Sequence, residues 1–146
     1  LALAADLIIA RRSAYLLLAF VNIGLVPDGG ASATVAERIG LTRAAELALL
    51  GERLGAEQAA DWGLINRCVD DERFDDEVAA LLARLTTGPT LAYAGIKRQL
   101  EAWRMSAFSD QLELEAEIQD RMADSGDFVA GVTGFLQQQA PVFEGR

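Results

Sequence analysis

Histidine is absent from the 146-residue sequence, and cysteine occurs once, as Cys68. The chain therefore lacks the commonest general base and the commonest zinc ligand, and no Cys/His spacing indicates a metal site. A single cysteine cannot form a disulfide within the chain, and its place in the apolar run INRCV favours a buried thiol in a reducing compartment. We expect any catalysis to depend on carboxylates, without a metal.

Positive charge is also scarce, because lysine occurs once, at Lys97, and the net charge is −9 with a pI near 4.4. Nucleic-acid binding depends on clusters of lysine and arginine that neutralise phosphates, so this composition argues against such a partner. The apolar start LALAADLII contains Asp6, has no basic leader and is too short to span a bilayer. We expect a cytoplasmic protein with no nucleic-acid or membrane partner.

Apolar residues, in contrast, make up 51% of the chain, which has the length of about one domain. Turn residues, cap residues and hydrophobic spacing predict an α/β segment up to about residue 70, followed by helices. The expected strands are 7–10, 15–18 and 64–69, with a helix end at 1–6. The expected helices are 30–39, 42–51, 56–62 and 70–87, then three that begin at 90, 109 and 127, the last ending near 139.

Asp28 is the carboxylate in the most informative stretch, FVNIGLVPDGG, which covers residues 20–30. Pro27 fixes its own φ, and Gly29 and Gly30 allow positive φ, so the pattern predicts a turn that opens a helix. An aspartate there has two interpretations. It is a preferred turn and N-cap residue, and it is also a carboxylate placed where backbone can approach a ligand closely.

Two longer stretches carry a resemblance: LALAADLIIARRSAYLLLAFVNIGLVPDGG at 1–30 and GLTRAAELALLGERLGAEQAADWGLINRCV at 40–69. They resemble the crotonase (enoyl-CoA hydratase/isomerase) superfamily, and the resemblance extends over essentially the whole chain. It implies an α/β fold, namely the C-terminal part of a crotonase (ClpP/crotonase-like) ββα spiral at 1–70, followed by a helical trimerisation region at 71–146. It also implies a homotrimer or a dimer of trimers, and it places this chain in the C-terminal half of the family fold, with both oxyanion-hole N–H donors outside it.

The resemblance further implies an acyl-CoA thioester as substrate, with coenzyme A entering as part of the substrate and no separate cofactor. Isomerase members carry an acid at the position of Asp28, where it moves a proton between carbons of the acyl chain. Hydratase members use two glutamates, and the second of these places holds Phe20, which cannot move a proton. We therefore expect isomerisation at Asp28 in the parent protein. The alternatives are an enoyl-CoA hydratase, which is a lyase, or a truncated, non-catalytic oligomerisation or binding piece.

The same resemblance assigns residues to substrate binding. Besides the catalytic acid Asp28, we expect these to be Phe20, Leu25, Gly29, Gly30 and Phe135. Many family members follow the phenylalanine at the position of Phe135 with a lysine that reaches the coenzyme A nucleotide. This chain has Gln138 at that place, so the charge of that contact is lost.

Overall fold

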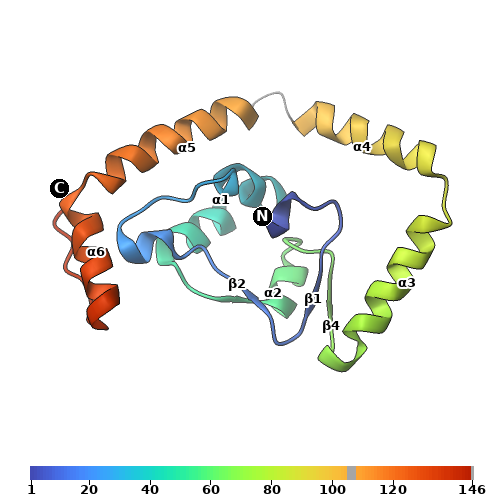
Figure 1. Ribbon diagram of the computed structural model, residues 1–146, viewed down its shortest axis with the longest axis horizontal. Helices are drawn as coiled ribbons and strands as arrows, with labels where there is room; N and C mark the ends of the chain where they lie inside the picture. Colours follow the sequence, from blue (N-terminus) through green and yellow to red (C-terminus); the bar gives the residue numbers. More distant parts are fainter. Residues whose placement is uncertain (105–107, 146) are drawn as a thin grey trace.

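The computed structural model describes residues 1–104 and 108–145. The first half of the chain forms a mixed α/β centre, and four long helices from the second half run in an arc around it (Figure 1). The sequence-based prediction of an α/β segment followed by helices is therefore confirmed. None of the helices among the described residues is long and apolar enough to cross a membrane.

The strands are short and form two separate pairs. Strand β1 (Ile9–Arg11) pairs in parallel with β4 (Arg67–Val69), and β2 (Tyr15–Leu16) pairs antiparallel with β3 (Leu54–Gly55). The predicted strand 64–69 is wrong in its first part. The N–H groups of Leu64 and Ile65 both donate to the carbonyl oxygen of Ala59, so these residues close the preceding helix and do not extend a sheet.

Glycines separate or follow the helical segments of the α/β centre, as the sequence predicts. Helix α1 (Ala31–Leu50) contains Gly40 at φ 75° and ψ 164°, which separates the two helical segments that the sequence predicts there. Helix α2 (Ala56–Asp61) is followed by Gly63 at φ 80°. The 3-10 helix η1 (Ala2–Ala4) stands in place of the expected helix end at 1–6, and a second 3-10 helix, η2 (Ala19–Ile23), follows the strand expected at 15–18.

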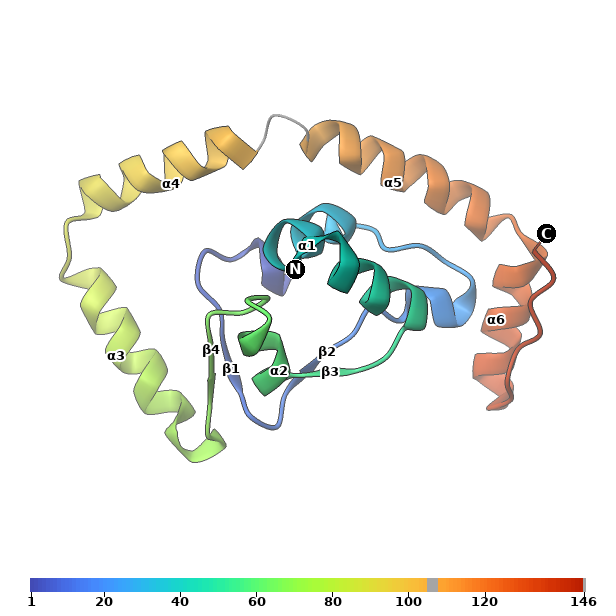
Figure 2. The same ribbon diagram turned by 180° about the vertical axis from the view of Figure 1, so that it is seen from behind.

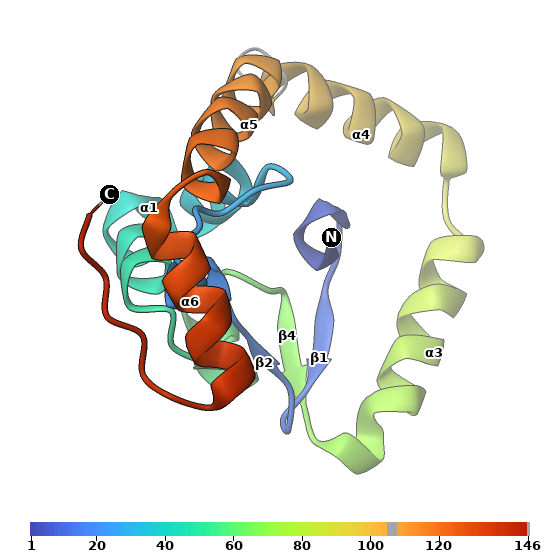
Figure 3. The same ribbon diagram turned by 60° about the vertical axis from the view of Figure 1, so that its left-hand side comes forward.

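The outer helices begin after the 3-10 turn η3 (Asp71–Arg73). They are α3 (Phe74–Thr86), α4 (Thr90–Arg104), α5 (Phe108–Ala123) and α6 (Gly126–Gln137). Figure 2 shows α3 beside β1 and β4, and Figure 3 shows α4 leading from α3 to the end at which α5 begins. The N-cap of α6 is Ser125, whose Oγ accepts a hydrogen bond from the N–H of Phe128 at 3.1 Å.

The hydrophobic core lies within the α/β centre. Its buried apolar side chains are Val35, Leu47, Leu54, Ala56, Ala59, Leu64 and Ile65. Large apolar side chains on the outer helices are exposed within this chain, for example Leu91, Leu100 and Phe135 at 90%, 64% and 74%. The chain's own packing therefore leaves a substantial apolar surface uncovered on α4 to α6.

Helix α6 packs directly on η2 by a close approach of their backbones. A Cβ atom built on Gly131 would lie 2.6 Å from the Cα atom of Ile23, and one built on Gly24 would lie 3.0 Å from the carbonyl carbon of Asp127. Each side of the contact thus has a glycine where a side chain would hold the elements apart. This contact fixes α6 against the segment that leads to Asp28.

Candidate active site

A cavity of about 520 Å³ opens between the N-terminal segment, residues 15–20, the start of α1 and the facing ends of α4 and α5. Its walls are mostly apolar and include Leu18, Val35 and Leu64. The charged side chains among the described lining residues are Asp28 and Arg104. An apolar cavity with few polar groups is typical of a small-molecule site.

Asp28 lies in the turn that the sequence predicts, immediately before α1. Gly29 and Gly30 have φ values of 61° and 78°, a region in which residues with side chains are strained, so both glycines are required by the backbone. The carbonyl oxygen of Asp28 accepts a hydrogen bond from the N–H of Ala31 at 3.0 Å. Its carboxylate is exposed at the rim of the cavity, where Oδ2 lies 3.5 Å from Nε2 of Gln119.

The N-terminus of α1 is capped by a different acid, Glu115 of α5. Its side chain accepts hydrogen bonds from the N–H groups of Gly30, at 2.6 Å, and Ser32, at 3.0 Å, and from the Ser32 hydroxyl at 2.5 Å. Glu115 is buried, with 4% of its surface exposed, and the free N–H groups of a helix start favour a carboxylate there. The interpretation of Asp28 as a helix-capping side chain is therefore not supported, since Glu115 has that role.

Sequence reasoning missed Glu115. The segment Glu113–Glu117 alternates acids with small or apolar residues, and nothing in that pattern distinguishes the middle acid from its neighbours. A hydrogen bond that joins residues 85 positions apart leaves no local signal. Only the packing of α5 on α1 reveals it.

The structure brings some of the predicted site residues together and leaves others apart. Phe20 and Gly29 line the same cavity as Asp28. Leu25 and Gly30 flank the turn but are not among the lining residues, and Phe135 lies on α6 with 74% of its surface exposed. The substrate-binding roles of all five residues stay predictions.

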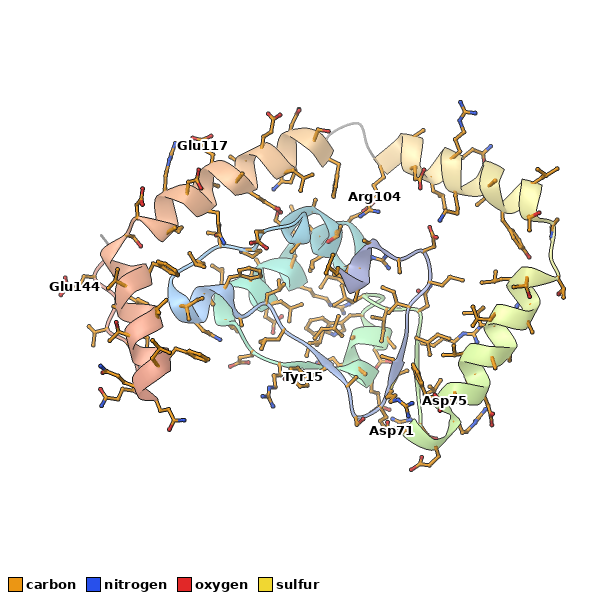
Figure 4. All side chains as sticks on the ribbon, viewed as in Figure 1. Tyr15, Asp71, Asp75, Arg104, Glu117 and Glu144 are labelled. Carbon is orange, nitrogen blue, oxygen red and sulfur yellow. The ribbon has the colours of Figure 1, made fainter. Side chains whose placement is uncertain are left out.

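Arg104 reaches from the end of α4 toward α1, as Figure 4 shows, and closes one side of the cavity. Its Nε lies 3.1 Å from Oε2 of Glu37, and its guanidinium stands over the ring of Phe108 at 5.2 Å. The Nε–H is not aligned for a hydrogen bond with Glu37, so the contact is an ion pair only. Glu37 is an exposed residue of α1, and its carboxylate is paired with Arg104.

A second polar cluster lies away from the cavity, at the turn between β1 and β2. Arg11 pairs with Asp75, and Arg12 pairs with Glu57 and Asp70. Figure 4 labels Asp71 and Asp75 of this cluster. Asp71 accepts hydrogen bonds from the hydroxyl and the N–H of Ser13, and the hydroxyl bond is the main cause that lowers the pKa of Asp71. These acids tie α2, η3 and the start of α3 to the turn, which is a structural role.

Comparison with known proteins identifies the class. The family profile described as "Enoyl-CoA hydratase/isomerase" matches residues 1–146, so the chain belongs to that family. The similar solved structures have the crotonase fold: an enoyl-CoA hydratase from Mycobacterium avium subsp. paratuberculosis superposes with a TM-score of 0.93 at 42% identity, covering 97% of this chain and 58% of that one. The expected fold family is confirmed.

Among curated relatives, a probable enoyl-CoA hydratase of Rhodobacter capsulatus is 42% identical over 146 residues, which are 100% of this chain and 57% of the relative. The segments ALLG (48–51) and AEQAADWG (56–63) predict a likeness to 1,2-epoxyphenylacetyl-CoA isomerase. That protein of Escherichia coli is 40% identical over 146 residues, again 100% of this chain, and 56% of the relative. The likeness is confirmed, and it describes what the chain is similar to.

The chain spans somewhat more than half the length of these relatives. A shared length of this kind does not confirm the expectation that the chain corresponds to the C-terminal half of the family fold. That placement stays a prediction.

Proposed function

We propose that the protein acts on an acyl-CoA thioester and isomerises an enoyl- or epoxy-acyl group by moving a proton at Asp28. The family assignment supports a thioester of this kind. The observation that carries the proposal is that Asp28 is the one carboxylate among the described residues that line the apolar cavity. Phe20, which stands where hydratase members have an acid, lines the same cavity.

The chemistry requires a base that can both remove and return a proton. For a 3-enoyl thioester, Asp28 takes a proton from C2, the carbon between the carbonyl and the double bond, and the electrons of the broken C–H bond delocalise to the thioester oxygen as a dienolate. The carboxylic acid of Asp28 then gives the proton to C4, so that the carbonyl re-forms and the double bond moves to C2–C3. General acid–base catalysis of this kind contributes about 100- to 10,000-fold in rate.

The enolate oxygen also needs hydrogen-bond donors, and each such donor is worth about 100- to 1,000-fold. In this proposal both donors come from outside the described residues, and Asp28 supplies the proton-transfer part of the site.

The buried acid Glu115 does not compete for this role. Both of its carboxylate oxygens already accept hydrogen bonds from α1, and it is not among the residues that line the cavity. Arg104, the other charged lining residue, is paired with Glu37. Asp28, whose carboxylate is exposed at the rim, is the acid that a substrate carbon can approach.

Hydration is the second candidate function, favoured by the similarity to a probable enoyl-CoA hydratase. It requires two acids around the attacked double bond, and Phe20 provides none. A non-catalytic oligomerisation or binding piece is the third candidate.

The isomerase proposal also includes the organisation of the protein. Residues 1–70 form the crotonase core, and 71–146 form the oligomerisation region of a cytoplasmic homotrimer or dimer of trimers. The protein uses no cofactor besides the coenzyme A of its substrate.

The test is to incubate the intact protein with a 3-enoyl-CoA and to follow the absorbance of the conjugated 2-enoyl thioester and the mass of the product. We expect isomerisation, and we expect Asp28→Asn to slow it by about 100- to 10,000-fold. Asp110→Asn, which changes an exposed acid on α5, is the matched control and should retain wild-type rate. A product that has gained one water would support the hydratase instead. Binding without any conversion would support the non-catalytic piece.

A further inference from the structure

Three polar side chains on one face of α5 contact the segment that carries Asp28. Gln111, Glu115 and Gln119 are spaced by four residues, so they lie on the same side of the helix. We call them the α5 polar row. The row faces the backbone between residues 26 and 32.

The middle member holds the backbone that follows Asp28. Glu115 receives the N–H groups of Gly30 and Ser32, one on each carboxylate oxygen, and Gln111 supports it by donating from Nε2 to the Ser32 hydroxyl at 2.6 Å. The ring of Phe108, also on α5, fills the space beside Gly30, where a Cβ would lie 2.6 Å from its Cζ atom. The turn is therefore held by both polar and apolar contacts from one helix.

The last member of the row contacts the other side of the turn. Oε1 of Gln119 accepts a hydrogen bond from the N–H of Val26 at 3.3 Å, and its Nε2 lies 3.5 Å from Oδ2 of Asp28. The backbone before Asp28, the backbone after it and the carboxylate itself thus all contact α5. Neither Glu115 nor Gln119 lines the cavity.

We propose that Glu115 and Gln119 are positioning residues that hold the carboxylate of Asp28 at the rim of the cavity. This inference rests on the proposed role of Asp28. It goes beyond that role by proposing that side chains of α5 hold the turn that carries Asp28. A misplacement of a catalytic group by about 1 Å can cost about 100-fold in rate, so a loosened turn should lower turnover even though the catalytic residue is unchanged.

The test compares Glu115→Gln with Glu113→Gln, which removes an exposed acid from the same helix. An amide nitrogen cannot accept the N–H that one oxygen of Glu115 now receives. In Glu115→Gln we expect faster amide hydrogen exchange at Gly30 and Ser32 and a kcat lower by about 10- to 100-fold with KM within about 2-fold. Combined with Asp28→Asn, the substitution should cause no further loss, because Glu115 acts through Asp28. Glu113→Gln should match the wild type in each measurement.

Gln119→Met provides a second variant in case Glu115→Gln does not fold, since it keeps the length of the side chain and removes only the amide. It should shift the NMR amide signals of Asp28 and Gly29 and lower kcat in the same way. Faster exchange in Glu115→Gln with an unchanged kcat would overturn the proposal and leave Glu115 as a structural cap.

Amide hydrogen exchange and NMR amide signals do not depend on catalysis, so they test the positioning role separately from the proposed function. If the wild-type protein converts no thioester, the isomerase proposal fails, while the exchange rates and the amide signals still decide whether the α5 polar row holds the turn. Unchanged exchange at Gly30 and unchanged signals at Asp28 in both variants would overturn the positioning role.

Discussion

Replacing Gly131 by alanine should destabilise the protein, although alanine is the better helix former. Gly131 lies in α6 where that helix meets η2, and the three atoms nearest to an added Cβ are all backbone atoms of Ile23, at 2.6, 2.6 and 2.8 Å. Carbon atoms pack favourably at about 3.5–4.0 Å, so the added methyl group overlaps by about 1 Å. Backbone cannot rotate away as a flexible side chain can, and α6 must therefore move.

The expected magnitude follows from two opposing effects. Gly→Ala inside a helix gains about 0.5–1 kcal/mol, whereas overpacking a well-packed contact costs about 1–3 kcal/mol. Because the overlap is with backbone, we expect the upper part of the second range and a net loss of about 1–2 kcal/mol. Gly95→Ala in α4 is the matched control. Apart from its chain neighbours and the backbone of its own helix, no atom of the described residues lies within 4 Å of a Cβ added at Gly95, so this variant should gain about 0.5–1 kcal/mol.

Urea unfolding followed by circular dichroism measures both variants, and native-state hydrogen exchange in α6 detects a helix that detaches before the rest unfolds. The two substitutions should move the unfolding midpoint in opposite directions, or Gly131→Ala should selectively increase exchange in α6. A Gly131→Ala protein with a midpoint at or above that of the wild type and normal protection of α6 would refute the close approach of α6 and η2.

Two further predictions concern the turn between β1 and β2 and the outer helices. Ser13→Ala removes the hydroxyl bond that is the main cause of the lowered pKa of Asp71. A group whose pKa is lowered in the folded state stabilises the fold above its unfolded pKa, and that contribution is lost as the pH falls through the folded pKa. The variant should therefore raise the pKa of Asp71 in a carboxyl NMR titration and weaken the loss of stability in acid below about pH 4. An unchanged titration of Asp71 would contradict this prediction. The exposed apolar side chains of α4 to α6 should be covered by other copies of the chain, so native mass spectrometry of the intact protein should find multiples of three copies, and a monomer at every concentration would contradict the proposed trimer.

The local parts of this fold could be predicted from the sequence because single residues determine them. Gly40 and Gly63 adopt the positive φ values that end helical segments, and the turn at residues 27–30 places Asp28 directly before α1. These features depend on the conformational range of glycine and proline. They are encoded within a few neighbouring residues, and the family resemblance adds the expected fold around them.

The features that could not be predicted depend on contacts between distant segments. The strand expected at 64–69 shortens to Arg67–Val69 because its first residues bond to the end of α2. The pairing of Glu37 with Arg104 requires the end of α4 to lie against α1. Residues 64–65 fit a strand or a helix end equally well, and Glu37 fits a solvated or a paired position equally well. Tertiary packing decides between these states.

The turn that carries Asp28 shows how these two kinds of information combine. Two successive glycines allow the backbone geometry, but each ordered residue costs about 1–2 kcal/mol of conformational entropy, and glycine loses the most freedom. A hydrogen bond to a charged group contributes about 1.5–3 kcal/mol, and Glu115 accepts two of them from the backbone of this turn and the first residues of α1. These bonds oppose the ordering cost, so the glycines permit the geometry of the turn and α5 holds it in place. The position of the candidate catalytic acid therefore depends both on its own turn residues and on a helix more than 80 residues away in the chain.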